Sequence, residues 1–180
     1  MKRLAAVLAL ILAASVPAAS IPAWAADDAL SLAANQAYLA ANAKKKGVIV
    51  RADGLQFKIL QNGFGKRPTP TDTVTVYYTG QLINGTVFDG TSAGLPASLK
   101  VNQVIGGWIE SLLLMREGDH WQLVIPSELG YGSRGAGNGT IPPNQTLVFD
   151  LRLVKTTPAP KKGDKDYRPD PNDKDADQQP

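Results

Sequence analysis

The sequence contains 180 residues, 43% of them hydrophobic, which is enough for one hydrophobic core and short for two. It has no cysteine, which excludes both a disulfide framework and a lipid-anchored cysteine. The formal net charge of +3 falls to +1 when Lys2 and Arg3 are subtracted with the N-terminal segment, so charge gives no argument for nucleic-acid binding.

The N-terminal segment, residues 1–25, has the pattern of a secretory signal peptide. Lys2 and Arg3 precede an uncharged run that extends to Ile21, and residues 23–25 (Ala-Trp-Ala) offer a small-x-small cleavage site. No later apolar run approaches the length that spans a bilayer. We therefore expect an exported protein without membrane insertion.

Residues 26–47 are rich in alanine and predict a helical stub. Asp27 or Asp28 can cap its start, the lysines at 44–46 suit the negative end of its dipole, and Gly47 is a natural stop. Its large apolar side chains are few: Leu30, Leu32, Tyr38 and Leu39. Such a helix is marginal alone, and we expect an appendage or the stub of an interaction arm.

From Gly54 onward the pattern is that of β-strands separated by turn residues. Alternating or β-rich stretches at 55–60, 73–79, 87–89, 120–125 and 147–153 predict strands. In the second of them Val74, Val76 and Tyr78 share one face, so Tyr78 is expected to point inward with the valines.

One short helix interrupts these strands. Two glycines, Gly106 and Gly107, let the chain turn out of an extended stretch, and Trp108 and Leu112 then stand four residues apart. The fold class that follows is α+β, an antiparallel sheet curled around one short helix, over roughly residues 48–155. Residues 156–180 contain five prolines and one large apolar residue, which predicts a disordered tail.

Two signals that resemble catalytic or cofactor motifs are rejected. Residues 130–135 match G-x-G-x-x-G, but the glycines and prolines that follow forbid the helix that a dinucleotide site requires. His120 is the only histidine, which argues against a zinc site, and its place on a strand opposite Trp121 predicts a surface residue. We expect no metal and no cofactor.

An aromatic and aliphatic set with one acid remains, and it predicts an apolar ligand pocket with Trp108 as its floor. Its members are Tyr78, Phe88, Asp89, Val104, Ile105, Trp108, Tyr131, Ile141 and Phe149. For each aromatic the alternative is plain core packing, and for Asp89 it is a turn residue before Gly90.

Six motifs in order resemble the FKBP-type peptidyl-prolyl cis/trans isomerases, over roughly residues 54–155. They are Val76-Tyr77-Tyr78-Thr79-Gly80, Gly85-Thr86-Val87-Phe88-Asp89, Val104-Ile105-Gly106-Gly107-Trp108, Tyr131-Gly132, Ile141-Pro142-Pro143 and Leu147-Val148-Phe149-Asp150. The stretch 33–48 resembles the end of the N-terminal helical arm of bacterial periplasmic members, whose longer arm forms dimers. Because only a stub of that arm is expected here, we predict a monomer.

The resemblance implies isomerase activity on X-Pro bonds of folding proteins in the periplasm, with secretion as the alternative location. It assigns catalytic roles to Tyr78, Asp89, Ile105 and Tyr131. Substrate-binding roles fall to Phe88, Val104, Trp108, Ile141 and Phe149. It also makes macrolide inhibitors candidate ligands.

The family motifs differ here in three places. Ala97 and Leu99 stand where an aromatic is common, Gly106 stands where many bacterial members have proline, and the 131–141 loop is rich in glycine. The competing function is a periplasmic chaperone or peptide-binding module with little turnover.

Overall fold

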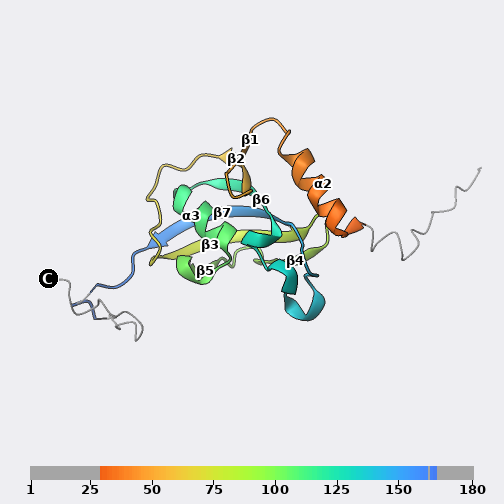
Figure 1. Cartoon of the computed structure of the whole chain (residues 1–180). Coiled ribbons are helices and arrows are strands. Elements are labelled where there is room, and N and C mark those ends of the chain that lie inside the picture. The colour runs from red at the N-terminus through yellow and green to blue at the C-terminus, as the bar shows by residue number, and fades with distance from the viewer. Residues whose placement is uncertain (1–28, 162, 166–180) are drawn as a thin grey trace, which may run out of the picture.

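The structure is a computed structural model, and it describes residues 29–161 and 163–165 (Figure 1). The predicted signal peptide and residues 166–180 of the predicted tail lie outside the described residues. None of the helices within the described ranges combines the length and the apolarity that a bilayer crossing needs.

Within the described part of the chain, seven strands form one antiparallel sheet in the order β1-β2-β6-β7-β3-β4, with β5 paired to β3. The strands are β1 (Val48–Val50), β2 (Gln56–Gln61), β3 (Thr73–Leu82), β4 (Val87–Gly90), β5 (Ala97–Lys100), β6 (His120–Ile125) and β7 (Leu147–Thr157). The predicted antiparallel α+β fold is confirmed.

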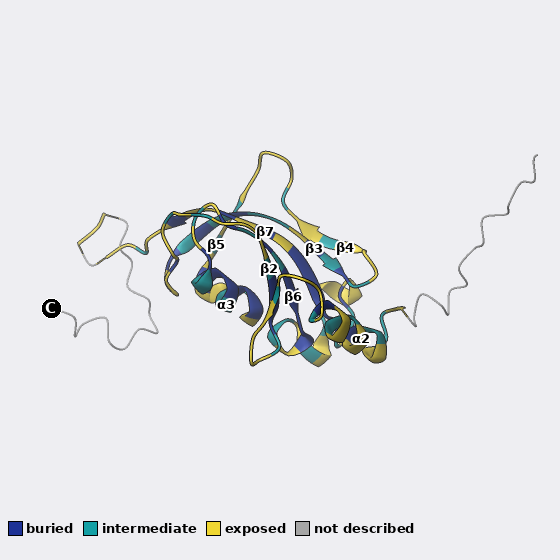
Figure 2. Ribbon diagram, turned by 90° about the horizontal axis from the view of Figure 1, so that it is seen from above, coloured by how far each residue is buried: buried dark blue, intermediate teal, exposed yellow. Residues whose placement is uncertain are grey.

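The helix α3 (Gly106–Leu114) packs against one face of this sheet, and Figure 2 shows the strands curving past it. Its apolar stripe is buried as predicted: Trp108 is 3% exposed, and Leu112 and Met115 are fully buried. Val74 and Val76 of β3 face the same core and are fully buried as well. Apolar contact with the sheet therefore stabilises this helix, because a helix of this length is only marginally stable by itself.

The helix α2 (Leu32–Asn42) differs in both ends from the predicted stub. Ser31, not Asp27 or Asp28, caps its start by accepting a hydrogen bond from the amide of Ala34 at 3.2 Å. The helix ends at Asn42, and the chain then turns until Gly47, whose φ of 81° suits glycine. The predicted caps Asp27 and Asp28 lie outside the described residues.

Two buried asparagines attach α2 to the sheet. The amide oxygen of Asn35 accepts a hydrogen bond from the Thr146 amide at 2.7 Å, and its Nδ2 donates to Gln145. At the other end of the helix, Asn42 donates to Gln56 at 2.9 Å. Buried amides with these partners specify one position for the helix, so α2 is docked by polar contacts that its weak apolar stripe did not predict.

The face of the sheet that α2 contacts is opposite to the α3 face. Gln56, Val124 and Val148 are register partners across β2, β6 and β7, and all three are buried. Their neighbours Leu123 and Phe149 point the other way, into the core with α3. Both faces of the central strands are therefore covered.

The predicted start of the tail at Thr156 is corrected by the structure. Strand β7 continues through Thr157, where it pairs with Thr73. Thr156 is 5% exposed, and its amide donates to the carboxylate of Glu117 at 2.6 Å. The polar sequence Lys-Thr-Thr at 155–157 has no hydrophobic alternation, so the pattern did not predict a strand there. These residues are extended because they pair with β3.

Candidate functional site

Four aromatic rings from four elements meet at the start of α3. The Trp108 indole contacts the rings of Tyr78 and Phe149 edge-on, with centroids 5.1 and 5.3 Å apart. Phe88 of β4 packs edge-on against Phe149 at 5.6 Å. Edge-to-face aromatic contacts of this kind fix ring orientation as well as burying area. Trp108 and Phe149 are buried, whereas Tyr78 and Phe88 remain partly accessible at the edge of the cluster.

One carboxylate lies at this edge. Asp89 is exposed, and its Oδ2 accepts a hydrogen bond from the Tyr78 hydroxyl at 2.7 Å, while its Oδ1 accepts from the Gly90 amide at 2.8 Å. Burial and, after it, the hydrogen bond to Asp89 raise the pKa of Tyr78 to about 12. The phenol therefore stays protonated, and remains a donor to the carboxylate, throughout the physiological range.

Two further polar groups are predicted for the site, the hydroxyl of Tyr131 and the amide of Ile105. Burial and, after it, the negative charge of Asp89 raise the pKa of Tyr131, whose side chain is 40% exposed. Ile105 is the N-cap of α3, and its carbonyl accepts from the Trp108 amide. Its own N–H donates to no acceptor among the described residues.

The remaining predicted site residues are apolar. Val104 packs against the core just before the helix and is half-buried. Ile141 is 6% exposed and belongs to the same core cluster as Trp108. Its backbone pairs with Ala136 through two hydrogen bonds of 2.9 and 3.0 Å, which closes the glycine-rich loop. All nine residues of the predicted set are described, and the aromatic contacts join Tyr78, Phe88, Trp108 and Phe149 directly.

Two residues that support the site were not singled out from the sequence. A side chain at Gly80 would place Cβ 2.6 Å from Phe149 and 2.7 Å from Phe88, so only glycine lets these rings meet. Thr91 holds the backbone of Tyr78: its hydroxyl accepts from the Tyr78 amide at 3.1 Å. Gly80 ends one of the quoted motifs, a signal that could have found it, whereas Thr91 carries no sequence signal.

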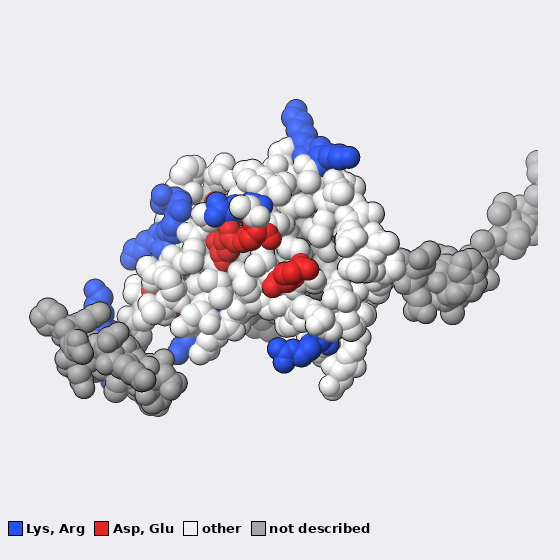
Figure 3. Space-filling view, viewed as in Figure 1, with Lys and Arg blue, Asp and Glu red and all other residues white. Residues whose placement is uncertain are grey.

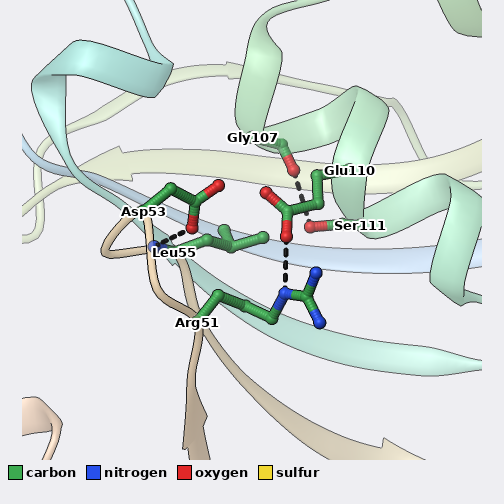
Figure 4. Close-up of polar contacts among 6 residues, drawn as sticks. All are labelled: Arg51, Asp53, Leu55, Gly107, Glu110 and Ser111. Atoms are coloured by element: carbon green, nitrogen blue, oxygen red, sulfur yellow. Dashed lines mark hydrogen bonds and ion pairs between the residues drawn. The ribbon is translucent and has the colours of Figure 1, made fainter.

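The solvent side of α3 carries a charged cluster next to Trp108 in the sequence (Figure 4). Glu110 accepts a hydrogen bond from Arg51 Nε at 2.6 Å, and Asp53 accepts one from the Leu55 amide. Burial and the hydrogen bond with Asp53 raise the pKa of Glu110, and that same hydrogen bond lowers the pKa of Asp53. The Arg51–Glu110 contact connects the β1–β2 turn to α3.

The rejected signals are located elsewhere. A dinucleotide-binding motif would require the first turn of an α-helix here, but residues 132–134 form a short 3-10 turn. His120 is partly accessible, and its Nε2 lies 2.7 Å from Asp150 Oδ1. Among residues 29–161 and 163–165, no three His, Cys, Asp or Glu side chains are grouped as a metal site would need.

Known proteins similar to this chain share one family. Residues 65–154 match the family described as FKBP-type peptidyl-prolyl cis-trans isomerase. The chain belongs to this family. Residues 18–59 match a second family, described as the domain amino terminal to FKBP-type peptidyl-prolyl isomerase.

Individual FKBP-type relatives are similar over the same region. The chain is 55% identical over 119 residues to the FKBP-type 22 kDa peptidyl-prolyl cis-trans isomerase of Escherichia coli, covering 66% of this chain and 57% of that protein. It is 49% identical over 128 residues to the outer membrane protein MIP of Legionella longbeachae, covering 71% and 54%. The chain therefore spans about half the length of these relatives.

Solved FKBP-type structures have the same fold. The crystal structure of FkpA from Escherichia coli aligns with a TM-score of 0.67 at 42% identity, covering 77% of this chain and 65% of that one. A peptidyl-prolyl cis-trans isomerase from Pseudomonas syringae aligns with a TM-score of 0.66 at 35% identity, covering 77% and 98%.

Proposed function

We propose that this chain is a peptidyl-prolyl cis/trans isomerase that acts on X-Pro bonds of exported proteins during folding. The observation that carries the proposal is the aromatic cluster around Trp108, with the hydrogen-bonded Tyr78–Asp89 pair at its accessible edge. Family membership supports the same activity.

The reaction needs no covalent step. Rotation about an X-Pro bond faces a barrier of about 18–20 kcal/mol, because resonance gives the C–N bond partial double-bond character. In the twisted transition state that resonance is lost, and the carbonyl oxygen carries less charge than in the planar amide. An apolar surface that excludes water therefore favours the twisted amide over the planar one.

The proposed roles follow from where each group lies. The proline ring rests on Trp108, with Tyr78, Phe88 and Phe149 around it and Val104 and Ile141 completing the apolar wall. The free N–H of Ile105 and the hydroxyl of Tyr131 bind substrate carbonyls and so fix the peptide on either side of the rotating bond. Asp89, held by Tyr78, presents a carboxylate beside that bond.

The test is the substitution Asp89→Val, measured as catalysed cis-to-trans conversion of a proline tetrapeptide. Removing a charged hydrogen-bonding group of this kind should lower kcat/KM by roughly tenfold or more. The matched control is Asp150→Val, another exposed aspartate, on β7. That control loses its contact with His120 but leaves the aromatic cluster intact, so its rate should match that of the unchanged protein.

Binding of the same peptide separates an isomerase from a chaperone with little turnover. Peptide affinity in Asp89→Val should fall much less than the rate, because ground-state binding relies on apolar contact. Circular dichroism checks that both variants are folded. An unchanged chain that binds the peptide but gives no rate above the spontaneous one would overturn the isomerase proposal and leave peptide binding as the function.

Location, ligands and assembly complete the proposal. We place the protein in the periplasm, or outside the cell, on the strength of the predicted signal at residues 1–25. Macrolide inhibitors would compete with proline for the ring cluster, and a competition assay with the tetrapeptide tests this. The exposed apolar side chain of α2, Leu32, is too small a surface for a durable dimer, so sedimentation should give the monomer mass.

A further inference from the structure

A hollow lies at the far end of α3 from Trp108. Its volume is about 540 Å³, within the range of ligand-binding clefts. Trp108 stands in the first turn of α3, whereas Leu114 is its last residue and lines the hollow. The side chains that matter here are Ile59, Phe64, Leu114 and Trp121, which are apolar, and Arg67 and Arg116, which are cationic. None of them belongs to the aromatic cluster described above.

The apolar part of this hollow combines a rigid wall with an exposed anchor. Trp121 stacks on Phe57 with ring centroids 4.5 Å apart and planes within 10° of parallel. Its indole N–H is buried and finds no acceptor among the described residues. Phe64 also lines the hollow, and its side chain is 92% exposed to solvent. Exposed aromatics next to fixed apolar walls are typical of binding hot spots.

Two arginines and one aspartate line the hollow: Arg67 and Arg116 are exposed, whereas Asp119 is 5% exposed. The acids at this end, Glu117 and Asp119, are engaged by backbone amides: Asp119 accepts from Gly63 and Arg116, and Glu117 from Thr156. The ion pairs found among the described residues, Arg51–Glu110 and His120–Asp150, involve neither Arg67 nor Arg116.

The two arginines at the hollow therefore have no carboxylate partner within residues 29–161 and 163–165. Figure 3 shows Lys and Arg atoms at several separate places over this face of the molecule, and acidic atoms near its centre. An arginine presents a planar fork of donors that matches a carboxylate, so this end of the molecule complements acidic groups.

We propose that this hollow is a second peptide-binding site, which takes an extended acidic segment of another protein with large apolar side chains. An apolar residue of the segment packs between Phe64 and Trp121, and its flanking carboxylates pair with Arg67 and Arg116. The site needs no proline and acts independently of the isomerase site. It holds an unfolded client at one end of α3 while the other end presents the aromatic cluster.

The test uses a fluorescein-labelled, proline-free peptide in which leucine and phenylalanine alternate with glutamate. Fluorescence polarisation measures its affinity for the full chain at low and high salt. We expect saturable binding that weakens as salt rises, and much weaker binding of the same peptide with lysine in place of glutamate. Equal binding of the acidic and basic peptides would overturn the proposal.

Variants locate the site. The double substitution Arg67→Glu with Arg116→Glu should weaken binding of the acidic peptide by about tenfold or more. The charge-matched control is the double substitution Arg152→Glu with Lys155→Glu, two exposed residues on β7 that do not line the hollow. Its affinity should stay near that of the unchanged chain. Loss of affinity in the control as large as in the Arg67→Glu, Arg116→Glu variant would mean that net charge alone drives binding, against the proposal.

A second variant pair keeps the test decisive if the double variant folds poorly. Phe64→Ser changes a side chain that is 92% exposed, so it should fold normally and still lose most of the affinity. The control is Leu95→Ser, an apolar side chain that is 70% exposed and lies outside the hollow, and it should bind as before. Unaltered binding by Phe64→Ser would overturn the proposal.

Two further outcomes also count against the proposal. Absence of binding by both the full chain and a chain ending at Lys165 would exclude the site. Binding seen only after removal of residues 166–180 would assign the hollow to this chain's own C-terminal segment. The tetrapeptide isomerase rate, measured on every variant, should not change, so failure here is distinguishable from failure of the proposed enzyme activity.

Discussion

The start of α3 offers a sharp test, because two adjacent glycines there should respond to substitution in opposite ways. Gly106→Pro should stabilise the protein. Gly106 is the first residue of α3, a position where proline is favoured. The residue before a proline must be extended, and Ile105 already is, with φ −63° and ψ 153°. The Gly106 amide donates no hydrogen bond to described residues, so none is lost.

The magnitude follows from the loss of unfolded-state freedom. Replacing a residue by proline where the native backbone fits gives about 0.4–1 kcal/mol. A Cβ at Gly106 would lie 3.5 Å from the Leu129 carbonyl oxygen and 3.7 Å from Leu129 Cδ2, which are ordinary contacts that add no strain. For a domain of this size the gain corresponds to a rise in Tm of about 2–6 °C.

Gly107→Ala, one residue later, should destabilise. In an exposed helix this change would gain about 1 kcal/mol. Here the added Cβ would lie 2.5 Å from Ile125 Cγ2 and 2.9 Å from its Cδ1, and Ile125 is fully buried. Overpacking of this kind costs about 1–3 kcal/mol, so the net effect is a loss of up to about 2 kcal/mol.

Thermal unfolding followed by circular dichroism measures both variants, with urea unfolding as a second probe. The expected result is a higher Tm for Gly106→Pro and a lower Tm for Gly107→Ala. Proline isomerase activity should survive in Gly106→Pro, because the Ile105 N–H that we assign to substrate binding is untouched. A fall in Tm for Gly106→Pro would refute the reasoning, since it would mean that the amide of residue 106 has a partner or that Ile105 is not extended.

Two further predictions concern the C-terminus and the site tyrosine. Removing residues 166–180 should leave Tm unchanged. Removing residues 156–180 should lower the free energy of unfolding by about 1–3 kcal/mol, because the hydrogen bond from the buried Thr156 amide to Glu117 is lost. Equal Tm values for the two truncated chains would contradict the extended β7. Phenolate absorbance should show one tyrosine titrating at about pH 12 that disappears in Tyr78→Phe. Because this pKa is raised above the ordinary 10.0, its stabilising contribution is complete below pH 10 and is lost as the pH rises through about 12; a Tyr78 titration near 10 would disprove it.

Several features of the protein are determined by local sequence alone. The alternation of Val74, Val76 and Tyr78 identifies β3 and its inward face, because the side-chain period of a strand is two wherever it is placed. The glycine pair before Trp108 likewise predicts where α3 begins. The aromatic residues that meet at Trp108 could be listed from the sequence because they fall in recognisable motifs.

The partners of polar groups were decided only by the tertiary structure. Asn35 is hydrogen-bonded to Thr146, and Thr156 to Glu117, because elements far apart in the chain pack together. No local pattern in the sequence therefore marks Asn35 or Thr156 as buried. Gly80 must be glycine because two rings from other strands converge on it. The hollow between Phe64, Arg116 and Trp121 likewise exists only once a loop, the end of α3 and β6 are packed together. Periodicity is a property of one segment, whereas hydrogen-bond partners, close contacts and hollows depend on which segments the sheet register brings side by side.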